Sequence, residues 1–402
     1  MPSLHLTEKA DAYLQMLCTK IPTRQVGSPG NRRATRFFQL VMDDLGFDTL
    51  TQPFNCLDMR QGDIQLSAGG RSFSARISPY SLGCDVSGKL VAASTLAELE
   101  DLQAHGCILL LRGELAREQL MPKNFVFYNP EHHQRIYRIL ESKQPAAIIA
   151  ATGRNPQLAG ALYPFPLFED GDFDIPSAYI TDVEGVTLAK LAGQQAMLRM
   201  DAQRIPAIAE NVIASKKGAA QAKIVVCAHI DAKAGTPGAL DNAGGTAVLL
   251  LLAELLKDEV LACGVEIVAF NGEDYYSAGG QMAYLAARRD SMQDIRLAIN
   301  LDGVGYRGHA SGLSFYDCPQ PEEKLSREIM GRYPGIKEMP QWQQGDHMIF
   351  VASQVPALAL TTTAFEELEA HFAHTAKDLP GLVDTSLLAD AALFLRDVLR
   401  EL

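Results

Sequence analysis

Short apolar runs alternate with helical segments in the second half of the chain. Four runs have the length and the content of branched residues that are typical of buried strands, namely residues 224–228, 265–270, 297–301 and 357–360. Strands that alternate with helices form a largely parallel sheet with helices on both of its faces. The pattern therefore predicts an α/β fold, a three-layer α/β/α domain built on a mixed, largely parallel sheet.

Helical spacing adds elements at both ends of the chain. It predicts helices over residues 7–20 and 34–45, with a break at 26–31 between them and a strand over 47–54. Two helices and one strand do not close a core, so this piece is expected to pack on the α/β domain. Inside that domain, residues 246–256 are apolar almost all round, which predicts a deeply buried helix.

The pattern of apolar and polar residues changes between residues 55 and 204. Short strand-like runs at 88–92, 107–111, 146–150 and 177–180 are separated by turns, and an amphipathic helix follows at 183–191. A chain of 402 residues also exceeds the size at which one core usually stops growing. We therefore expect a discontinuous α/β domain made of residues 1–54 and 205–402, interrupted by a β-rich inserted domain at 55–204.

The composition of the chain narrows the range of binding partners and cellular locations that it could have. The net charge of −12 argues against nucleic acid and against anionic membrane surfaces, because both are bound through an excess of Lys and Arg. The start of the chain lacks the pattern of a secretory signal, and no run of about 18 consecutive apolar residues stands out as a membrane span. Seven scattered cysteines without a CxxC pair fit a reducing compartment. A cytoplasmic location without membrane or nucleic-acid partners is the expectation.

Acidic and histidine side chains stand at or just after the ends of the predicted strands, or in loops beside them. In chain order they are His229, Asp231, Asp241, Glu273, Asp274, Asp302 and His374. Each has an ordinary interpretation when it is taken alone: His229 as a core histidine, Asp241 as a helix N-cap, and the Glu273–Asp274 pair as a solvated turn. Because the carboxyl ends of parallel strands meet at one edge of a sheet, we expect the whole group to lie close together.

Together these residues have the composition of a two-zinc hydrolytic site. Imidazole and carboxylate groups are zinc ligands, and zinc lowers the pKa of a bound water to about 7. In an adjacent pair such as Glu273–Asp274, one carboxylate can bind metal while the other takes a proton from water. Asp231 stands two residues after His229, where it can orient the imidazole ring.

The order His-x-Asp, Asp-Asn, Glu-Asp, Asp, His resembles the co-catalytic zinc aminopeptidase family, which also contains glutamate carboxypeptidases, glutaminyl cyclases and transferrin-receptor-like proteins. Residues 27–31 and 345–350 are similar to segments of that family, and residues 55–204 resemble a protease-associated domain. The resemblance implies one zinc on His229 and Asp302, a second on Asp274 and His374, and a bridge through Asp241. It also implies Glu273 as general base and a cis peptide bond between residues 241 and 242.

A metal-dependent exopeptidase that acts on peptide or aminoacyl substrates is therefore the expected function, and aminopeptidase is the first choice. Two zinc ions are the expected cofactors, with Co²⁺ or Mn²⁺ as the alternative metals. A carboxypeptidase or dipeptidase of the same family, a catalytically silent receptor-like protein and a one-zinc cyclase are the alternatives.

Two departures from the family pattern bear on this function. Asp274 stands where many members have a longer glutamate. Ala373 stands where some members have a tyrosine that contacts the tetrahedral intermediate, and Tyr306 is the candidate to replace that tyrosine. Glu366–Glu367 is interpreted first as a solvated acidic turn and second as a binder of a substrate α-amine. The loop 169–172 has the same two kinds of interpretation, solvated loop or cleft wall, and His371 is expected to be a helix-surface histidine.

Overall fold

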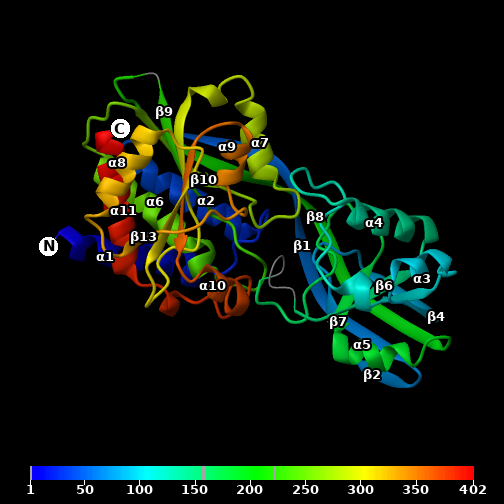
Figure 1. Cartoon of the computed structure of the whole chain (residues 1–402). Helices are drawn as coiled ribbons and strands as arrows, with labels where there is room; N and C mark the ends of the chain where they lie inside the picture. Colours follow the sequence, from blue (N-terminus) through cyan, green and yellow to red (C-terminus); the bar gives the residue numbers. More distant parts are fainter. Residues whose placement is uncertain (1, 155–159, 221) are drawn as a thin grey trace. The chain divides into compact units, whose positions relative to one another are not determined.

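The computed structural model describes residues 2–154, 160–220 and 222–402 (Figure 1). Contacts divide the chain into two compact units, one made of residues 1–56 and 208–402 and the other of residues 57–207. The boundaries that the sequence predicts, after residues 54 and 204, lie two and three positions from these. Each unit is described by itself below.

The larger unit is built on a mixed sheet. Its strand order is β13 (Ile336–Glu338), β12 (Ser311–Tyr316), β14 (Ala357–Thr362), β11 (Ile295–Leu301), β9 (Lys223–His229), β10 (Gly264–Phe270) and β8 (Gln195–Lys216). The four central strands, from β14 to β10, are parallel, while β12 and β8 run antiparallel to their neighbours β14 and β10. The prediction of an α/β fold with a mixed, largely parallel sheet is confirmed.

Alternate residues of the central strands enter two separate cores, which is why the fold has three layers. On β9, Ile224, Val226 and Ala228 join a core on one face, and Val225 and Cys227 join a second core on the other. The first face is covered by α1 (Pro2–Gln15), α2 (Pro29–Asp44), α6 (Gly244–Leu256) and α11 (Thr385–Glu401). The second is covered by α7 (Gly279–Ala287) and α9 (His347–Ala352), and the remaining helices of this unit are α8 (Gln320–Met330) and α10 (Phe365–His371).

Helix α6 belongs to a segment, Ala239–Leu256, that is long and apolar enough by composition to cross a membrane. Asp241, Asn242 and Glu254 interrupt its apolar residues, so it is not a consecutive apolar run. In the folded chain 83% of this segment is buried, because α6 packs against the sheet with α1 and α11 over it. A helix that is apolar all round suits such a central place in a protein core.

The start of α2 also differs from the prediction. Residues 26–31 were expected to separate two helices, but α2 begins at Pro29, five positions before the predicted start at residue 34. Ser28 is its N-cap and accepts a hydrogen bond from the Asn31 amide at 3.1 Å. Serine at the N-cap followed by proline in the first turn is a helix-start signal, since proline lacks only an amide that has no helical partner there.

The unit of residues 57–207 has an α/β architecture of its own. Its parallel strands are β4 (Cys84–Ala93), β5 (Ile108–Leu111), β6 (Ala147–Thr152) and β7 (Ser177–Thr181), with β3 (Arg76–Ile77) antiparallel to β7. The unit also contains α3 (Leu96–Asp101), α4 (Glu131–Lys143), α5 (Asp182–Ala189) and the short β2 (Arg71–Phe73). The expectation of a β-rich insert was therefore too narrow, since the amphipathic helix α4 was missed.

Two long strands belong partly to each unit. Strand β1 (Asp48–Ala68) pairs with β2 and β8. Strand β8 pairs with β10 through residues 212–216 in the larger unit and with β4 through residues 195–200 in the other.

The burial of His347, on α9, predicts that the folded protein loses stability at acidic pH. Burial lowers its pKa to about 4, although a hydrogen bond with the Trp342 carbonyl acts in the opposite direction. As the pH falls below about 6.5, the unfolded chain binds a proton here that the folded chain does not bind until about pH 4. We expect unfolding by urea to become easier by roughly 2–3 kcal/mol across this window. His347→Gln keeps a donor for the carbonyl but does not titrate, so the loss attributable to this residue should be absent; equal pH dependence in both proteins would contradict the assignment.

Candidate metal centre

The candidate residues meet at the carboxyl edge of the central strands. Strand β9 ends at His229, which is opposite Phe270, the last residue of β10. Strand β11 ends at Leu301, directly before Asp302. Parallel pairing therefore brings the loops after β9, β10 and β11 to one edge.

Two histidine–acid pairs share one carboxylate at this edge. His229 Nε2 lies 3.2 Å from Asp241 Oδ1 and 3.6 Å from Asp302 Oδ1. His374 Nε2 lies 3.2 Å from Asp241 Oδ2 and 3.1 Å from Asp274 Oδ1. The two oxygens of Asp241 thus face different histidines, so the group divides into two halves joined by that carboxylate.

The charge and burial of this group fit divalent cations. Burial opposes protonation of His374, but the carboxylates of Asp274 and Asp241 outweigh it and raise its pKa well above the ordinary value. Within this group of described residues, both ring nitrogens of His229 and Asp274 Oδ2 are buried atoms without a hydrogen-bond partner. Buried polar atoms are normally paired, and nitrogen and carboxylate oxygen are zinc ligands. The donor set therefore fits two zinc ions, one in each half.

The loop that carries Asp241 is held by side chains behind it. The Asp378 carboxylate accepts hydrogen bonds from the amides of Leu240, at 2.8 Å, and Asp241, at 3.0 Å. The side-chain amide of Asn242 donates to the Leu301 carbonyl at 2.8 Å, which ties the loop to the end of β11. The peptide bond between Asp241 and Asn242 is cis, as the family resemblance implies.

Asp231 contacts two parts of the centre. Its Oδ1 lies 3.6 Å from His229 Nδ1, so the carboxylate faces the ring nitrogen that is turned away from the other acids. It also accepts the amides of Gly272, at 2.7 Å, and Asp274, at 3.1 Å. The sequence indicated only the first contact; the second makes Asp231 an anchor for the loop of the Glu273–Asp274 pair.

Glu273 is half-buried beside these acids, and no described residue forms an ion pair with it. Burial raises the pKa of its carboxyl well above the ordinary value, and the charges of Asp274 and Asp302 act in the same direction, against His229. A free carboxyl group with a raised pKa next to a metal-binding set has the properties of a proton acceptor that can also return the proton.

Two acids near the centre were not given a role by the sequence analysis. Asp346 is fully buried; its Oδ1 accepts a hydrogen bond from Gln281 at 2.7 Å, and burial raises its pKa to about 7. Burial also raises the pKa of Glu369 to about 7, although the charge of His374 opposes the shift. Lone acids within helical or loop sequence carry no spacing signal, so only the fold reveals them.

The remaining candidates fall at varied places. The hydroxyl of Tyr306 donates to Glu367 at 2.8 Å, so each is already engaged by the other. His371 is exposed at the end of α10, as predicted. In the loop 169–172, Asp170 is buried and accepts the amides of Lys123 and Asp172 at 2.8 and 2.7 Å, which gives this acid a local structural role.

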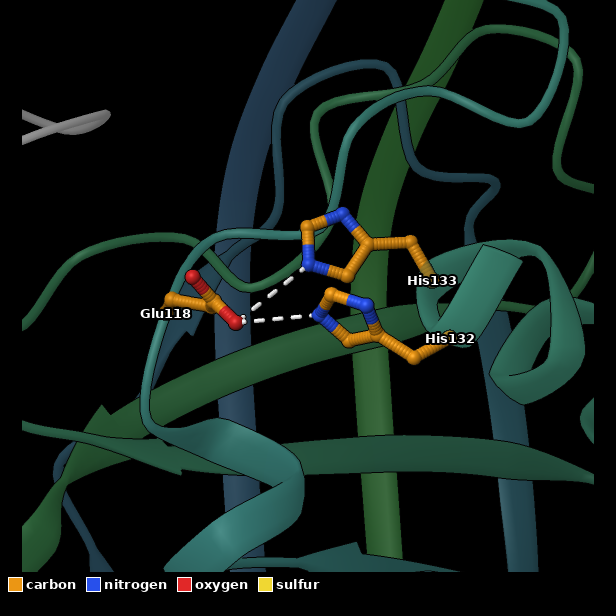
Figure 2. A group of neighbouring side chains, drawn as sticks. All are labelled: Glu118, His132 and His133. Carbon is orange, nitrogen blue, oxygen red and sulfur yellow. Dashed lines mark hydrogen bonds and ion pairs between the residues drawn. The ribbon is translucent and has the colours of Figure 1, made fainter. Parts of the chain in front are cut away.

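A second group with metal-ligand chemistry lies in the unit of residues 57–207 (Figure 2). Glu118 Oε1 lies 3.2 Å from His132 Nε2 and 3.5 Å from His133 Nε2. The Met121 amide, however, donates to His133 Nδ1 at 3.1 Å. A neutral imidazole that accepts at Nδ1 carries its proton on Nε2, so no lone pair is left there for a metal. We interpret this group as a polar cluster around Glu118, with no metal site at His133.

Part of the larger unit is similar to known proteins. Residues 211–399 match the model of Peptidase family M28. The protein YfbL of Escherichia coli (strain K12) is 26% identical over 194 residues, which are 39% of this chain and 60% of YfbL. The alkaline phosphatase isozyme conversion protein of the same organism is 29% identical over 131 residues, 29% of this chain and 38% of that protein. The chain thus spans less than two thirds of either curated relative.

Solved structures show the same fold over nearly the whole chain. An aminopeptidase from Aneurinibacillus sp. strain AM-1 superposes with a TM-score of 0.76 at 22% identity, covering 98% of this chain and 92% of the other. BSAP, a zinc aminopeptidase from Bacillus subtilis, gives a TM-score of 0.76 at 21% identity and coverages of 98% and 94%. The sequence match contains the whole proposed centre, from His229 to His374. Residues 211–399 are thus similar to Peptidase family M28.

Proposed function

We propose that this chain is a zinc-dependent exopeptidase that removes N-terminal residues from peptides. The observation that carries the proposal is the shared carboxylate of Asp241, whose two oxygens each lie 3.2 Å from a different histidine. This arrangement suits two metal ions side by side, with His229 and Asp302 on one and His374 and Asp274 on the other. Similarity to structures described as aminopeptidases supports the choice of reaction.

When bound, two zinc ions would polarise the scissile carbonyl and lower the pKa of the attacking water. Glu273 takes the proton from that water and passes it to the leaving amine, since its carboxyl is unpaired and its pKa is raised. Asp231 keeps the His229 ring oriented and the loop of Glu273 in place through the Gly272 and Asp274 amides. Asp378 holds the loop of Asp241 by accepting the amides of Leu240 and Asp241.

The shorter side chain of Asp274 does not weaken the case for two metals. Its Oδ1 lies 3.1 Å from His374 Nε2, and its buried Oδ2 has no partner among the described residues. A carboxylate so placed reaches the same half of the centre as His374. We therefore propose that both zinc positions are filled in the active protein, with Co²⁺ or Mn²⁺ as the alternative metals.

We propose further that residues 57–207 are an inserted domain of the protease-associated type. The separation of this unit by its own contacts supports an insertion between the two parts of the peptidase unit. The cytoplasmic location expected from the sequence stays a prediction.

The proposal predicts chelator-sensitive hydrolysis that needs a free amine. Aminoacyl p-nitroanilides of several residue types should be cleaved, and full removal of metal should abolish cleavage until zinc is returned. Their N-acetylated counterparts should be inert. Cleavage that survives metal removal would overturn the metal mechanism, equal cleavage of acetylated substrates would refute the aminopeptidase choice, and zinc binding without hydrolysis of any peptide would favour the receptor-like alternative.

A further inference from the structure

The guanidinium of Arg24 lies buried against the loop that joins His229 to Asp241. Arg24 is 1% exposed. Its Nε donates to the Ile230 carbonyl at 3.0 Å, and its two terminal nitrogens donate to the carbonyls of Pro237 at 2.7 Å and Gly238 at 2.8 Å. A fourth bond, of 2.8 Å, reaches the Leu17 carbonyl in the N-terminal helical segment. One rigid fork of donors thus connects the N-terminal segment to this loop.

The acceptors bracket the chain between the two candidate ligands. Ile230 follows His229 directly, and Gly238 lies three positions before Asp241. The amide of Asp241 is bound from another direction by Asp378. Arg24 therefore binds the carbonyls of Ile230, Pro237 and Gly238. Asp378 binds the amides of Leu240 and Asp241 at the end of the same loop.

Gly238 permits this close approach. Its φ is +59°, and a Cβ atom at this position would lie 2.8 Å from the nearer Arg24 terminal nitrogen and 2.4 Å from the Asp241 carbonyl oxygen. Both distances are shorter than van der Waals contact. The absence of a side chain at residue 238 thus lets the guanidinium and the backbone of Asp241 both approach the loop closely.

The same N-terminal segment also reaches the loop after β10. Asn31 donates to the Arg24 carbonyl at 3.0 Å and exchanges hydrogen bonds of 2.8 and 3.0 Å with the side chain of Asn271. Asn271 follows the last residue of β10 and stands two positions before Glu273. Arg24 therefore binds the loop that leads to Asp241, and Asn31 binds the loop that leads to Glu273.

We propose that Arg24 is a positioning residue for the metal centre, which sets the spacing between His229 and Asp241 from the N-terminal segment. The inference rests on the proposed function in that the centre binds zinc. A buried side chain that orients metal ligands without touching the metal changes metal affinity by about 10–100-fold when it is removed. Arg24 belongs to this class because each of its three loop contacts lies between the two ligands.

The test is the zinc dissociation constant of metal-free protein, measured by competition with a chromogenic chelator. Arg24→Lys keeps the charge, but one ammonium cannot serve carbonyls on several sides, so we expect zinc binding weaker by at least about 10-fold. Gly238→Ala crowds the same guanidinium and should act in the same direction. Circular dichroism at the assay temperature selects folded variants, and Arg24→Met is added where it folds.

Arg296→Met is the matched control. Arg296 bonds Glu322 at 2.8 and 3.1 Å and the Leu402 carbonyl at 2.5 Å, and it stands at the amino end of β11, the end away from the centre. Its loss should lower the unfolding temperature and leave zinc affinity unchanged. Wild-type affinity in folded Arg24→Lys, or an equal loss in Arg296→Met, would overturn the positioning role. A wild-type protein that binds no zinc would instead overturn the proposed function itself.

Discussion

Replacing Glu273 by glutamine should lower kcat for peptide hydrolysis by about 10²–10⁴-fold, the usual contribution of a positioned general base. The variant keeps the size and the hydrogen-bonding ability of the side chain but cannot take a proton from water. Zinc stoichiometry should stay at the wild-type value, because Glu273 is not among the groups that lie within ion-pair distance of the histidines. Measured together, rate and metal content separate loss of the base from loss of the centre.

Glu328→Gln is the control for this experiment. Glu328 is exposed on α8, and its carboxylate lies 3.8 Å from the Lys324 ammonium, a weak surface pair. Its rate should match that of the wild type. Turnover of Glu273→Gln within about two-fold of wild type would remove the base assignment, while loss of zinc from this variant would show that Glu273 is a ligand instead.

Asp241→Asn should abolish activity through loss of metal. A carboxamide has one acceptor oxygen in place of two charged ones, so it cannot serve both halves of the centre. Since Asp241 lies 3.2 Å from both His229 and His374, the change removes the anion that the two halves share. We expect zinc content to fall from two ions to one or none, and activity to fall in parallel, as measured by elemental analysis and by hydrolysis of aminoacyl p-nitroanilides.

The control for Asp241→Asn is Asp290→Asn, a change of the same chemistry at an exposed position after α7. It should bind two zinc ions and keep wild-type rates. If Asp241→Asn also retains two zinc ions at wild-type affinity, the bridge assignment is wrong. Retention of one ion with measurable turnover would restrict the proposal to a single catalytic metal.

The sequence predicted the central strands because buried parallel strands leave contiguous apolar runs. The run at 224–228 became β9, Lys223–His229, and that at 297–301 became β11, Ile295–Leu301. The strand β12, Ser311–Tyr316, was missed: it is antiparallel to β14, and its serines and glycine interrupt the apolar pattern. His229, Glu273 and Asp302 were found for the same reason as the strands, since they stand at or just after the ends of apolar runs. Asp241 and His374 lie in loops farther along the chain.

What the sequence could not indicate are contacts between distant residues. Arg24 and the carbonyl of Gly238 are 214 positions apart, and Asn31 and Asn271 are 240 positions apart. No local spacing distinguishes such a buried arginine from an exposed one, because its partners are backbone carbonyls that every residue has. Asp346 is similar: its burial and its bond with Gln281, 65 positions away, follow from packing of α7 and α9 on one face of the sheet.

The composition of α6 has a consequence for how the protein is made. The segment Ala239–Leu256 resembles a bilayer-spanning helix until α1 and α11 cover it, and it begins only two residues before Asp241. A newly synthesised chain therefore exposes this apolar segment until α11, which extends to Glu401, has been synthesised and can pack on it. Variants that delay this closure should be lost to aggregation or to chaperone capture during synthesis, even where the finished protein would be stable.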